Sequence, residues 1–171
     1  MEIVTQKGYT AQDIAKWFLY KNYAEQKQKI AANDDYEVYE GITHLKLQKL
    51  LYNAQGVSLA LTGEKLFEDD LEAWTHGPVV KEVYDTYCVF GKNPIIIPAT
   101  PENDEVVRKI ESDARVKEIL DMVYDNFSIY TAWQLREMSH AKGSPWDKTE
   151  KNTTIDTNLI KQYFENEVVE K

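Results

Sequence analysis

Cysteine is almost absent from this chain of 171 residues, which contains only Cys88. One thiol cannot form an internal disulfide, and so sparse a use of cysteine is typical of proteins that fold in a reducing compartment. Long apolar runs are missing as well, because no stretch approaches the roughly 20 residues that a membrane-spanning helix needs. The first residues also lack the charged-then-apolar pattern of a secretory signal. We therefore expect a cytoplasmic protein with no membrane partner.

Glycine is scarce, with seven residues scattered over the chain. The Gly-rich patterns of P-loops, dinucleotide-binding turns and nucleophile elbows are absent. Ser139 and His140 are adjacent, and adjacent side chains on a helix point about 100° apart, which disfavours a proton relay between them. Cys88 belongs to no recognisable activating motif. The sequence therefore predicts a protein that is not an enzyme and uses no cofactor.

Three histidines, His44, His76 and His140, leave one alternative open. They lie on different expected elements, and no two have the three- or four-residue spacing of a helical ligand pair. A structural role is the favoured interpretation of each, so we expect no metal site. A histidine-dependent metal enzyme remains the alternative.

The chain has fewer basic than acidic residues: 20 Lys and Arg compared with 29 Asp and Glu, which gives a formal net charge of -9 at pH 7. Such a chain repels nucleic acid phosphates on average and favours basic partners. Hydrophobic residues make up 43% and aromatic residues 12%, which is typical of a folded domain. At this length we expect one domain over residues 1–171, with a loop at 33–41 and a frayed tail at 167–171.

Hydrophobic periodicity predicts a mainly α-helical fold of about six helices with a small two-stranded β element. Thr10 and Asp13 form an approximate capping box for a first helix that runs to about Ile30. Thr43 caps a second helix, which ends near Gly63. The expected buried face of that helix comprises Leu47, Leu50, Leu51, Ala54, Val57, Ser58 and Leu61.

The remaining elements follow from turn and cap signals. Residues 71–74 and 95–97 are the two expected strands, and we expect them to pair. Pro78 fits the first turn of a third helix. Ser128 is the expected cap of a helix that carries Met138 on its inner face.

Two further helices are predicted where a short polar residue precedes a segment with apolar residues at helical spacing. Ser112 or Asp113 is expected to begin a helix, with residues 102–111 already helical. Asp156 is expected to cap the last helix.

The second helix carries polar residues that suggest a partner-binding surface. Lys46, Gln48 and Lys49 lie off its expected buried face, and Lys46 and Lys49 could form a small exposed basic island. Gln55 lies at the edge of the apolar stripe and needs a partner if buried. We expect it to bond to residues 74–76.

Two tryptophans stand next to turns that contain proline. We expect Trp74 in the core, because tryptophan is a common core residue. Trp146 follows Ser144-Pro145, and we expect its ring to stay partly exposed and to contact a partner.

Three ordered motifs resemble those of one family. L-K-L-Q-K-L-L-Y-N-A-Q-G lies at 45–56, L-F-E-D-D-L-E-A-W-T-H-G-P-V-V-K-E-V-Y at 66–84, and S-H-A-K-G-S-P-W at 139–146. This pattern resembles the Panacea domain of the SocA-like and GepA-like antitoxins carried by bacteria and their phages. Asn53 departs from the family pattern, in which an aromatic residue often follows the tyrosine.

The resemblance implies an antitoxin that neutralises a cognate protein toxin, usually encoded next to it, by direct binding. A proteolytic adaptor that delivers a bound protein to a host protease is the alternative. The motif residues are expected to build mostly the scaffold. They are Leu47, Gln48, Lys49, Leu50, Tyr52, Gln55, Gly56, Trp74, His76, Gly77, Pro78, Val79, Tyr84, His140, Pro145 and Trp146.

Overall fold

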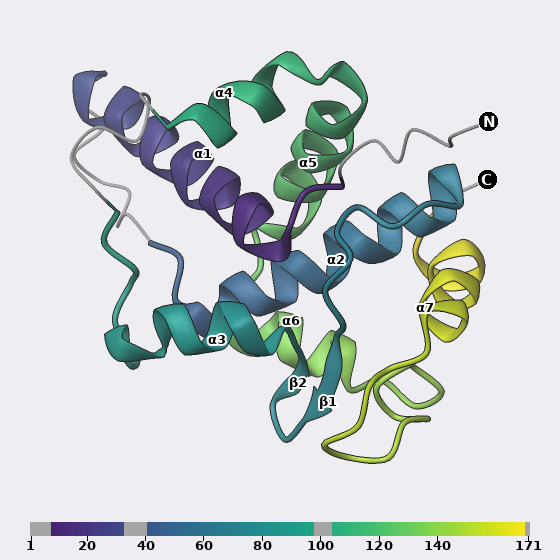
Figure 1. Ribbon diagram of the computed structural model, residues 1–171. Helices are drawn as coiled ribbons and strands as arrows, with labels where there is room; N and C mark the ends of the chain where they lie inside the picture. The colour runs from purple at the N-terminus through teal and green to yellow at the C-terminus, as the bar shows by residue number, and fades with distance from the viewer. Residues whose placement is uncertain (1–7, 33–40, 98–103, 170–171) are drawn as a thin grey trace.

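The computed structural model describes residues 8–32, 41–97 and 104–169 (Figure 1). The described residues form seven α-helices and one β-hairpin, which confirms the mainly helical class. Of the expected loop at 33–41, all but Gly41 lies outside the described residues. The elements are α1 (Ala11–Ala31), α2 (His44–Thr62), β1 (Glu72–Trp74), β2 (Gly77–Val79), α3 (Lys81–Tyr87), the 3-10 turn η1 (Cys88–Phe90), α4 (Glu105–Ser112), α5 (Ala114–Phe127), α6 (Ala132–Ser139), α7 (Thr157–Tyr163) and the π-helical turn η3 (Phe164–Val168).

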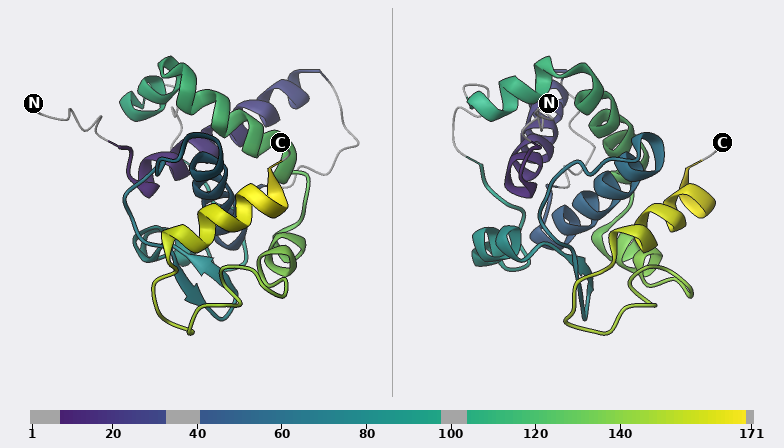
Figure 2. Two further views of the ribbon diagram at one scale, coloured as in Figure 1. Left: turned by 90° about the vertical axis from the view of Figure 1, so that its right-hand side faces the viewer. Right: turned by 45° about the vertical axis from the view of Figure 1, so that its right-hand side comes forward.

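Helix α2 lies at the centre of the molecule. In Figure 1, α1, α4 and α5 lie on one side of it, and α3, the hairpin, α6 and α7 lie on the other. Figure 2 shows α7 crossing over α2 on the side that faces away from α3. Every residue of α2 from Lys46 to Leu59 is buried. A helix enclosed in this way has no solvent face.

This enclosure corrects two predictions about α2. Lys46, Gln48 and Lys49 were expected on an exposed face, but their exposures are 5%, 2% and 0%. Leu61 was expected in the core, but it lies beyond the enclosed part and is 47% exposed. The other residues of the expected apolar face are buried as predicted.

Most of the expected caps are confirmed. Thr10 and Asp13 form a complete capping box at the start of α1. Thr43 accepts a hydrogen bond at the start of α2, and Gly63 ends that helix with a left-handed φ of 73°. Such a conformation is easily reached by glycine, which has no Cβ. Asp113 caps α5.

Two later helix starts had different outcomes. Asp156 caps α7, as expected. Ser128 does not cap α6; its backbone is helical, because it ends α5. Thr131 is the cap instead, with the extended φ and ψ that the position requires, and it forms a capping box with Gln134.

The hairpin corrects the expected strand pairing. β1 pairs with β2, not with residues 95–97, and Pro78 lies in β2 rather than in the first turn of α3. Pro78 stands opposite Ala73, whose N–H donates to Thr153 and whose carbonyl accepts from Asn152. The ladder therefore needs no N–H from the proline, which removes the usual objection to proline in a strand.

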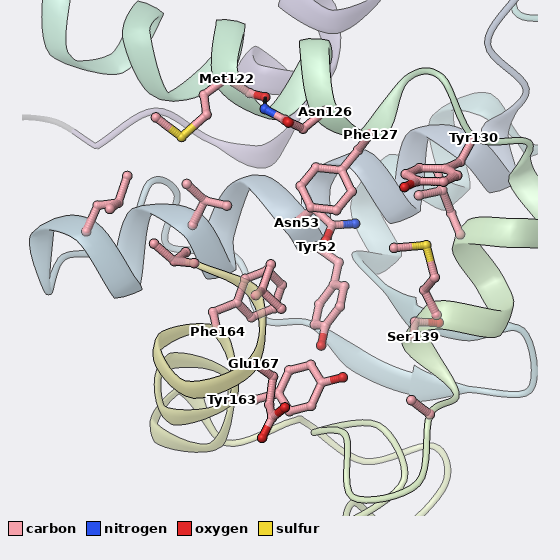
Figure 3. Close-up of a pocket in the computed structure, with 17 residues that line it drawn as sticks. Tyr52, Asn53, Met122, Asn126, Phe127, Tyr130, Ser139, Tyr163, Phe164 and Glu167 are labelled. Atoms are coloured by element: carbon pink, nitrogen blue, oxygen red, sulfur yellow. Dashed lines mark hydrogen bonds between the residues drawn. The ribbon is translucent and has the colours of Figure 1, made fainter. Parts of the chain in front are cut away.

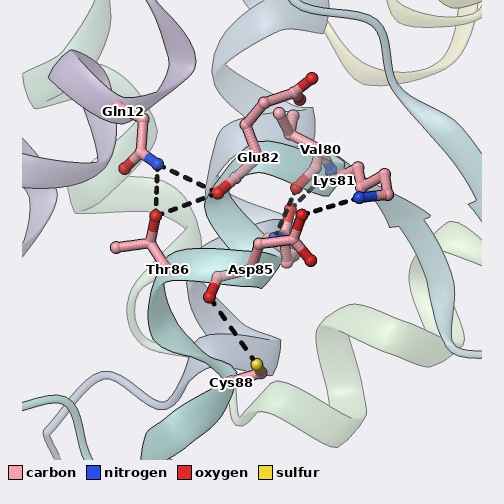
Figure 4. Close-up of polar contacts among 8 residues, drawn as sticks. Gln12, Val80, Lys81, Glu82, Asp85, Thr86 and Cys88 are labelled. Atoms are coloured by element: carbon pink, nitrogen blue, oxygen red, sulfur yellow. Dashed lines mark hydrogen bonds and ion pairs between the residues drawn. The ribbon is translucent and has the colours of Figure 1, made fainter.

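Helix α1 also contacts α3 through a polar side chain (Figure 4). The Nε2 group of Gln12 donates to the carbonyl oxygen of Glu82 at 3.0 Å and to the hydroxyl of Thr86 at 2.5 Å. Both bonds are exposed, so their expected contribution to stability is modest.

The C-terminal segment is more ordered than expected. Phe164 begins η3 and is fully buried, and Val168 and Val169 pack against the core. The expected fraying from residue 167 is therefore wrong for residues 167–169, and 170–171 lie outside the described residues. No helix among the described residues is long and apolar enough to cross a membrane.

Candidate functional site

The polar motif residues of α2 hold the hairpin to the central helix. Gln48 forms two hydrogen bonds with the backbone of Val80: its Nε2 donates to the carbonyl oxygen at 3.1 Å, and its Oε1 accepts from the N–H at 2.8 Å. Lys49 Nζ donates to the carbonyl oxygen of Pro78 at 3.0 Å. Lys46 Nζ donates to the carbonyl oxygen of Ser128 at 2.7 Å, where α5 ends. A cation at a helix C-terminus is favourable.

These contacts overturn the prediction of an exposed basic island. Lys46 and Lys49 point to opposite partners inside the protein, one at the end of α5 and the other in β2. Burial, and secondarily the charge of Arg136, lowers the pKa of Lys49 to about 7. A lysine in such surroundings loses much of its preference for the charged form. Neither lysine is available to a partner.

Gln55 holds the segment that follows α2. Its Nε2 donates to the carbonyl oxygen of Phe67 at 2.8 Å, and its Oε1 accepts from the N–H groups of Leu66 at 2.8 Å and Phe67 at 3.3 Å. The sequence left the burial of Gln55 open, and the side chain is 3% exposed; the expected bond to residues 74–76 was wrong. The side chain satisfies an irregular stretch of backbone closer along the chain.

Two motif glycines allow close packing around α2. A Cβ added to Gly56 would lie 2.4 Å from atoms of the Phe164 ring. A Cβ on Gly77 would lie 2.8 Å from both Lys49 Cε and Ser139 Oγ. Gly77 also has a φ of 112°, which a residue with a side chain rarely adopts. Both positions therefore require glycine for the observed packing.

The third motif closes over the hairpin. Trp146 Nε1 donates a hydrogen bond of 2.6 Å to the carbonyl oxygen of Trp74. The His140 ring stacks on the Trp146 ring, with the ring centroids 3.7 Å apart and an angle of 8° between the ring planes. Lys151 Nζ lies 3.7 Å from the centroid of the Trp146 ring. The half-buried ring of Trp146 is thus already used within the fold, so we do not retain it in a proposed partner surface.

The three histidines do not meet at one point. His44 packs edge-on against Tyr84, with ring centroids 5.6 Å apart. His76 Nδ1 accepts a hydrogen bond of 3.2 Å from Arg136 Nε. Arg136 lies on α6, and His140 is the residue that ends this helix. Burial, followed by the charges of Arg136 and Lys49, lowers the pKa of His140. Within the part of the chain that the structure describes, no three His, Cys, Asp or Glu side chains are grouped to hold a metal.

A pocket of about 830 Å³ adjoins this scaffold, between α2, α5, α6 and the α7–η3 segment (Figure 3). We call it the α5–α7 groove. Its lining is mostly apolar and includes five aromatic rings and two methionines. These are Tyr52, Met122, Phe127, Tyr130, Met138, Tyr163 and Phe164.

Among the buried polar atoms that line the α5–α7 groove, the hydroxyl of Tyr52 has no partner in the described chain. Tyr52 is 3% exposed, and its hydroxyl makes no hydrogen bond within the described residues. Burial raises the pKa of this hydroxyl, so it is a neutral donor. Figure 3 shows the hydroxyl pointing into the groove on the side of Tyr163. The sequence placed Tyr52 in a motif but gave no sign that its hydroxyl would lack a partner.

Comparison with known proteins agrees with the three motifs. A family model described as Antitoxin SocA-like, Panacea domain, matches residues 47–147, more than half of the chain. Antitoxin SocA of Caulobacter vibrioides (strain NA1000 / CB15N) is 34% identical over 110 residues, which cover 62% of this chain and 58% of that relative. The match thus spans less than two thirds of the relative's length.

No solved structure matches the chain. The family resemblance inferred from the motifs is nevertheless confirmed by the family model and by the curated relative. The protein belongs to the Antitoxin SocA-like, Panacea domain family.

Proposed function

We propose that this protein is a non-enzymatic antitoxin that neutralises a cognate protein toxin by direct binding. The observation that carries the proposal is the family match over residues 47–147, which contains the second and third motifs and all but the first two residues of the first. A relative with a similar sequence over 110 residues bears the name Antitoxin SocA. The toxin is proposed to be encoded next to this gene and to meet the antitoxin in the cytoplasm.

The roles of the motif side chains support a binding protein. Gln48, Lys49 and Gln55 bond to main-chain groups of neighbouring segments. Gly56 and Gly77 permit close packing. These roles support the proposal that the family pattern mostly builds a scaffold, and the toxin is expected to bind on surface that the scaffold presents.

The proposed mechanism is steric. Antitoxin binding would cover a functional surface of the toxin, and a stable complex would bury at least about 1,000 Å² in total. The net charge of -9 favours a toxin with a basic contact surface, because opposite charges speed and orient association.

Growth rescue in coexpression tests the proposal. The product of each adjacent open reading frame is induced alone and then together with this protein, which carries an affinity tag. We expect one product to arrest growth, the antitoxin to restore growth, and the two proteins to copurify. If no adjacent product is toxic, or if rescue occurs without a complex, direct neutralisation of a neighbouring toxin is wrong.

Purified components separate steric neutralisation from an adaptor role. A steric antitoxin inhibits its toxin in a mixture of two proteins. An adaptor requires a host protease, and the toxin then disappears only in cells that contain that protease. Persistence of the toxin in a protease-deficient host, together with rescued growth, is the expected result.

A further inference from the structure

The α5–α7 groove combines a polar group that lacks a partner with an apolar rim. The hydroxyl of Tyr52 is buried without a partner in the described chain, although nearly all buried polar groups in native proteins are bonded. It is directed toward Tyr163, which also lines the groove, so a ligand would reach it by displacing the Tyr163 side chain (Figure 3). A ligand that accepts a hydrogen bond there would remove the cost of the unpaired donor.

Exposed apolar side chains collect around the same groove. Leu61, Met122 and Met138 line it and are 47%, 39% and 44% exposed. They are three of the eight large exposed hydrophobic residues in the described chain. Such clustering marks an interaction site.

Charge around the groove favours a basic partner. Glu118 and Asp125 lie on α5 at four residues before and three residues after Met122, so the three share one exposed stripe of the helix. Glu167 lines the groove from η3. None of these three carboxylates has an ion-pair partner among the described residues, whereas nine ion pairs link other charges there.

We propose that the α5–α7 groove is the toxin-binding site and that it receives an amphipathic helix of the toxin. The helix would place apolar residues at positions i, i+3 or i+4, and i+7 against the rings and methionines. Lysines or arginines at its flanks would face Glu118, Asp125 and Glu167. A side-chain acceptor, or a free carbonyl at the helix end, would bond to Tyr52. This inference rests on the antitoxin function proposed above.

The methionines make a direct test possible. The chain has three methionines; Met122 and Met138 both line the groove, and Met1 lies outside the described residues. Protein labelled with ¹³C in the methionine methyl groups gives three signals, which Met122→Leu and Met138→Leu variants assign. The probe is the purified toxic product of the adjacent gene. We expect the Met122 and Met138 signals to shift or broaden in a saturable way as the toxin is added.

Variants with a matched control locate the binding energy. Met138→Lys puts a positive charge in the groove and is expected to weaken toxin binding by about tenfold or more, as at interface hot spots. Val89→Lys makes the same kind of change at a side chain that is 80% exposed in η1, outside the groove, and is expected to bind like wild type. Circular dichroism and thermal unfolding of both variants check that they fold.

Tyr52→Phe separates binding from folding. The variant removes a donor that has no partner in the described chain, so its stability is expected to equal or exceed that of wild type. Its toxin affinity is expected to fall by about threefold to tenfold, the equivalent of one lost hydrogen bond. A merely structural tyrosine would not produce this pair of effects.

The outcomes distinguish the two proposals. If wild-type protein neither rescues growth nor binds a neighbouring product, the antitoxin function fails. If wild type binds the toxin but Met138→Lys and Tyr52→Phe bind equally well and the groove signals do not move, the groove assignment alone is wrong. Methionine shifts that depend on antitoxin concentration without toxin would indicate a second copy in the groove and would also overturn the assignment.

Discussion

The Nζ atom of Lys49 donates a hydrogen bond of 3.0 Å to the carbonyl oxygen of Pro78 and has no exposed surface. This bond joins the central helix to the β2 strand, and it places an ionisable amine in the fully buried interior of the fold. Burial lowers the pKa of the amine to about 7, with a further contribution from Arg136. Lys49 therefore couples folding to pH.

We predict that stability rises with pH between about 7 and 9. The pKa of Lys49 is near 10.4 in the unfolded chain and about 7 in the folded protein, so in this window the unfolded state binds the extra proton. Stability then increases with pH at up to about 1.4 kcal/mol per pH unit. Below pH 7 the Lys49 amine is protonated in both the folded and the unfolded state, so it no longer makes stability depend on pH. Urea unfolding at half-unit pH intervals measures the slope.

Lys49→Met and Lys27→Met test the assignment of this slope. Methionine fits the apolar surroundings and does not titrate, so we expect the rise between pH 7 and 9 to disappear. Lys27 is exposed on α1, and its replacement should leave the rise unchanged. Equal slopes in wild type and Lys49→Met would show that another group binds the proton.

Gln55→Ala is predicted to destabilise the protein far more than Gln12→Ala. Loss of the Gln55 amide leaves three buried backbone groups without this partner: the N–H of Leu66 and the N–H and carbonyl oxygen of Phe67. The expected loss is roughly 2–4 kcal/mol, because each orphaned buried group is costly. Gln12 joins α1 to α3 at the surface, where water replaces its bonds, and its loss should be below about 1 kcal/mol (Figure 4). Comparable values from urea unfolding would contradict the assigned role of Gln55.

Two neighbouring hydroxyl residues test which of them begins α6. Thr131→Ala removes the cap that accepts from the Gln134 N–H, and it should cost about 1 kcal/mol. Ser128→Ala should have almost no effect, because Ser128 contributes its backbone carbonyl, which the variant keeps, to Lys46. Thermal unfolding of the two variants is expected to show a lower melting temperature for Thr131→Ala alone. The reverse order would restore the cap expected from the sequence.

The sequence predicted features that depend on local chemistry. Thr10, Thr43, Asp113 and Asp156 cap helices because a short polar side chain reaches a backbone N–H a few residues away, whatever the rest of the chain does. Gly63 ends α2 for an equally local reason. Such signals can be interpreted without knowledge of the fold.

Features that depend on the surroundings of α2 could not be predicted. Periodicity divides a helix into an apolar and a polar face, but α2 is covered on both, so its polar residues turned out to bind buried backbone. Nothing local reveals that Pro78 O and Val80 lie beside Lys49 and Gln48. The α5–α7 groove brings α2 together with α5, α6 and the α7–η3 segment, all of which lie far from α2 in the sequence.

The hairpin was misassigned because two local signals competed. Gly77-Pro78 is a common start of a helix, and that signal hid the tight turn between β1 and β2. Residues 152–153 satisfy the backbone groups of Ala73 that face away from β2. That third segment lies about 75 residues further along the chain, beyond the reach of pattern analysis.

Gly56→Ala provides the last prediction, since two effects of opposite sign meet there. Helix propensity alone favours alanine over glycine by about 1 kcal/mol. A Cβ at this position would, however, lie 2.4 Å from the Phe164 ring, and relieving such overpacking costs about 1–3 kcal/mol or more. We expect net destabilisation.

Phe164→Leu shows whether the ring is the cause. If the contact sets the cost, the double variant Gly56→Ala/Phe164→Leu loses less stability than the sum of the two single variants, by about 0.5–3 kcal/mol. Additivity within about 0.5 kcal/mol would mean that the ring moves aside freely. Because Phe164 also lines the α5–α7 groove, the same double variant is expected to alter toxin affinity, which links the packing of the family glycine to the proposed binding surface.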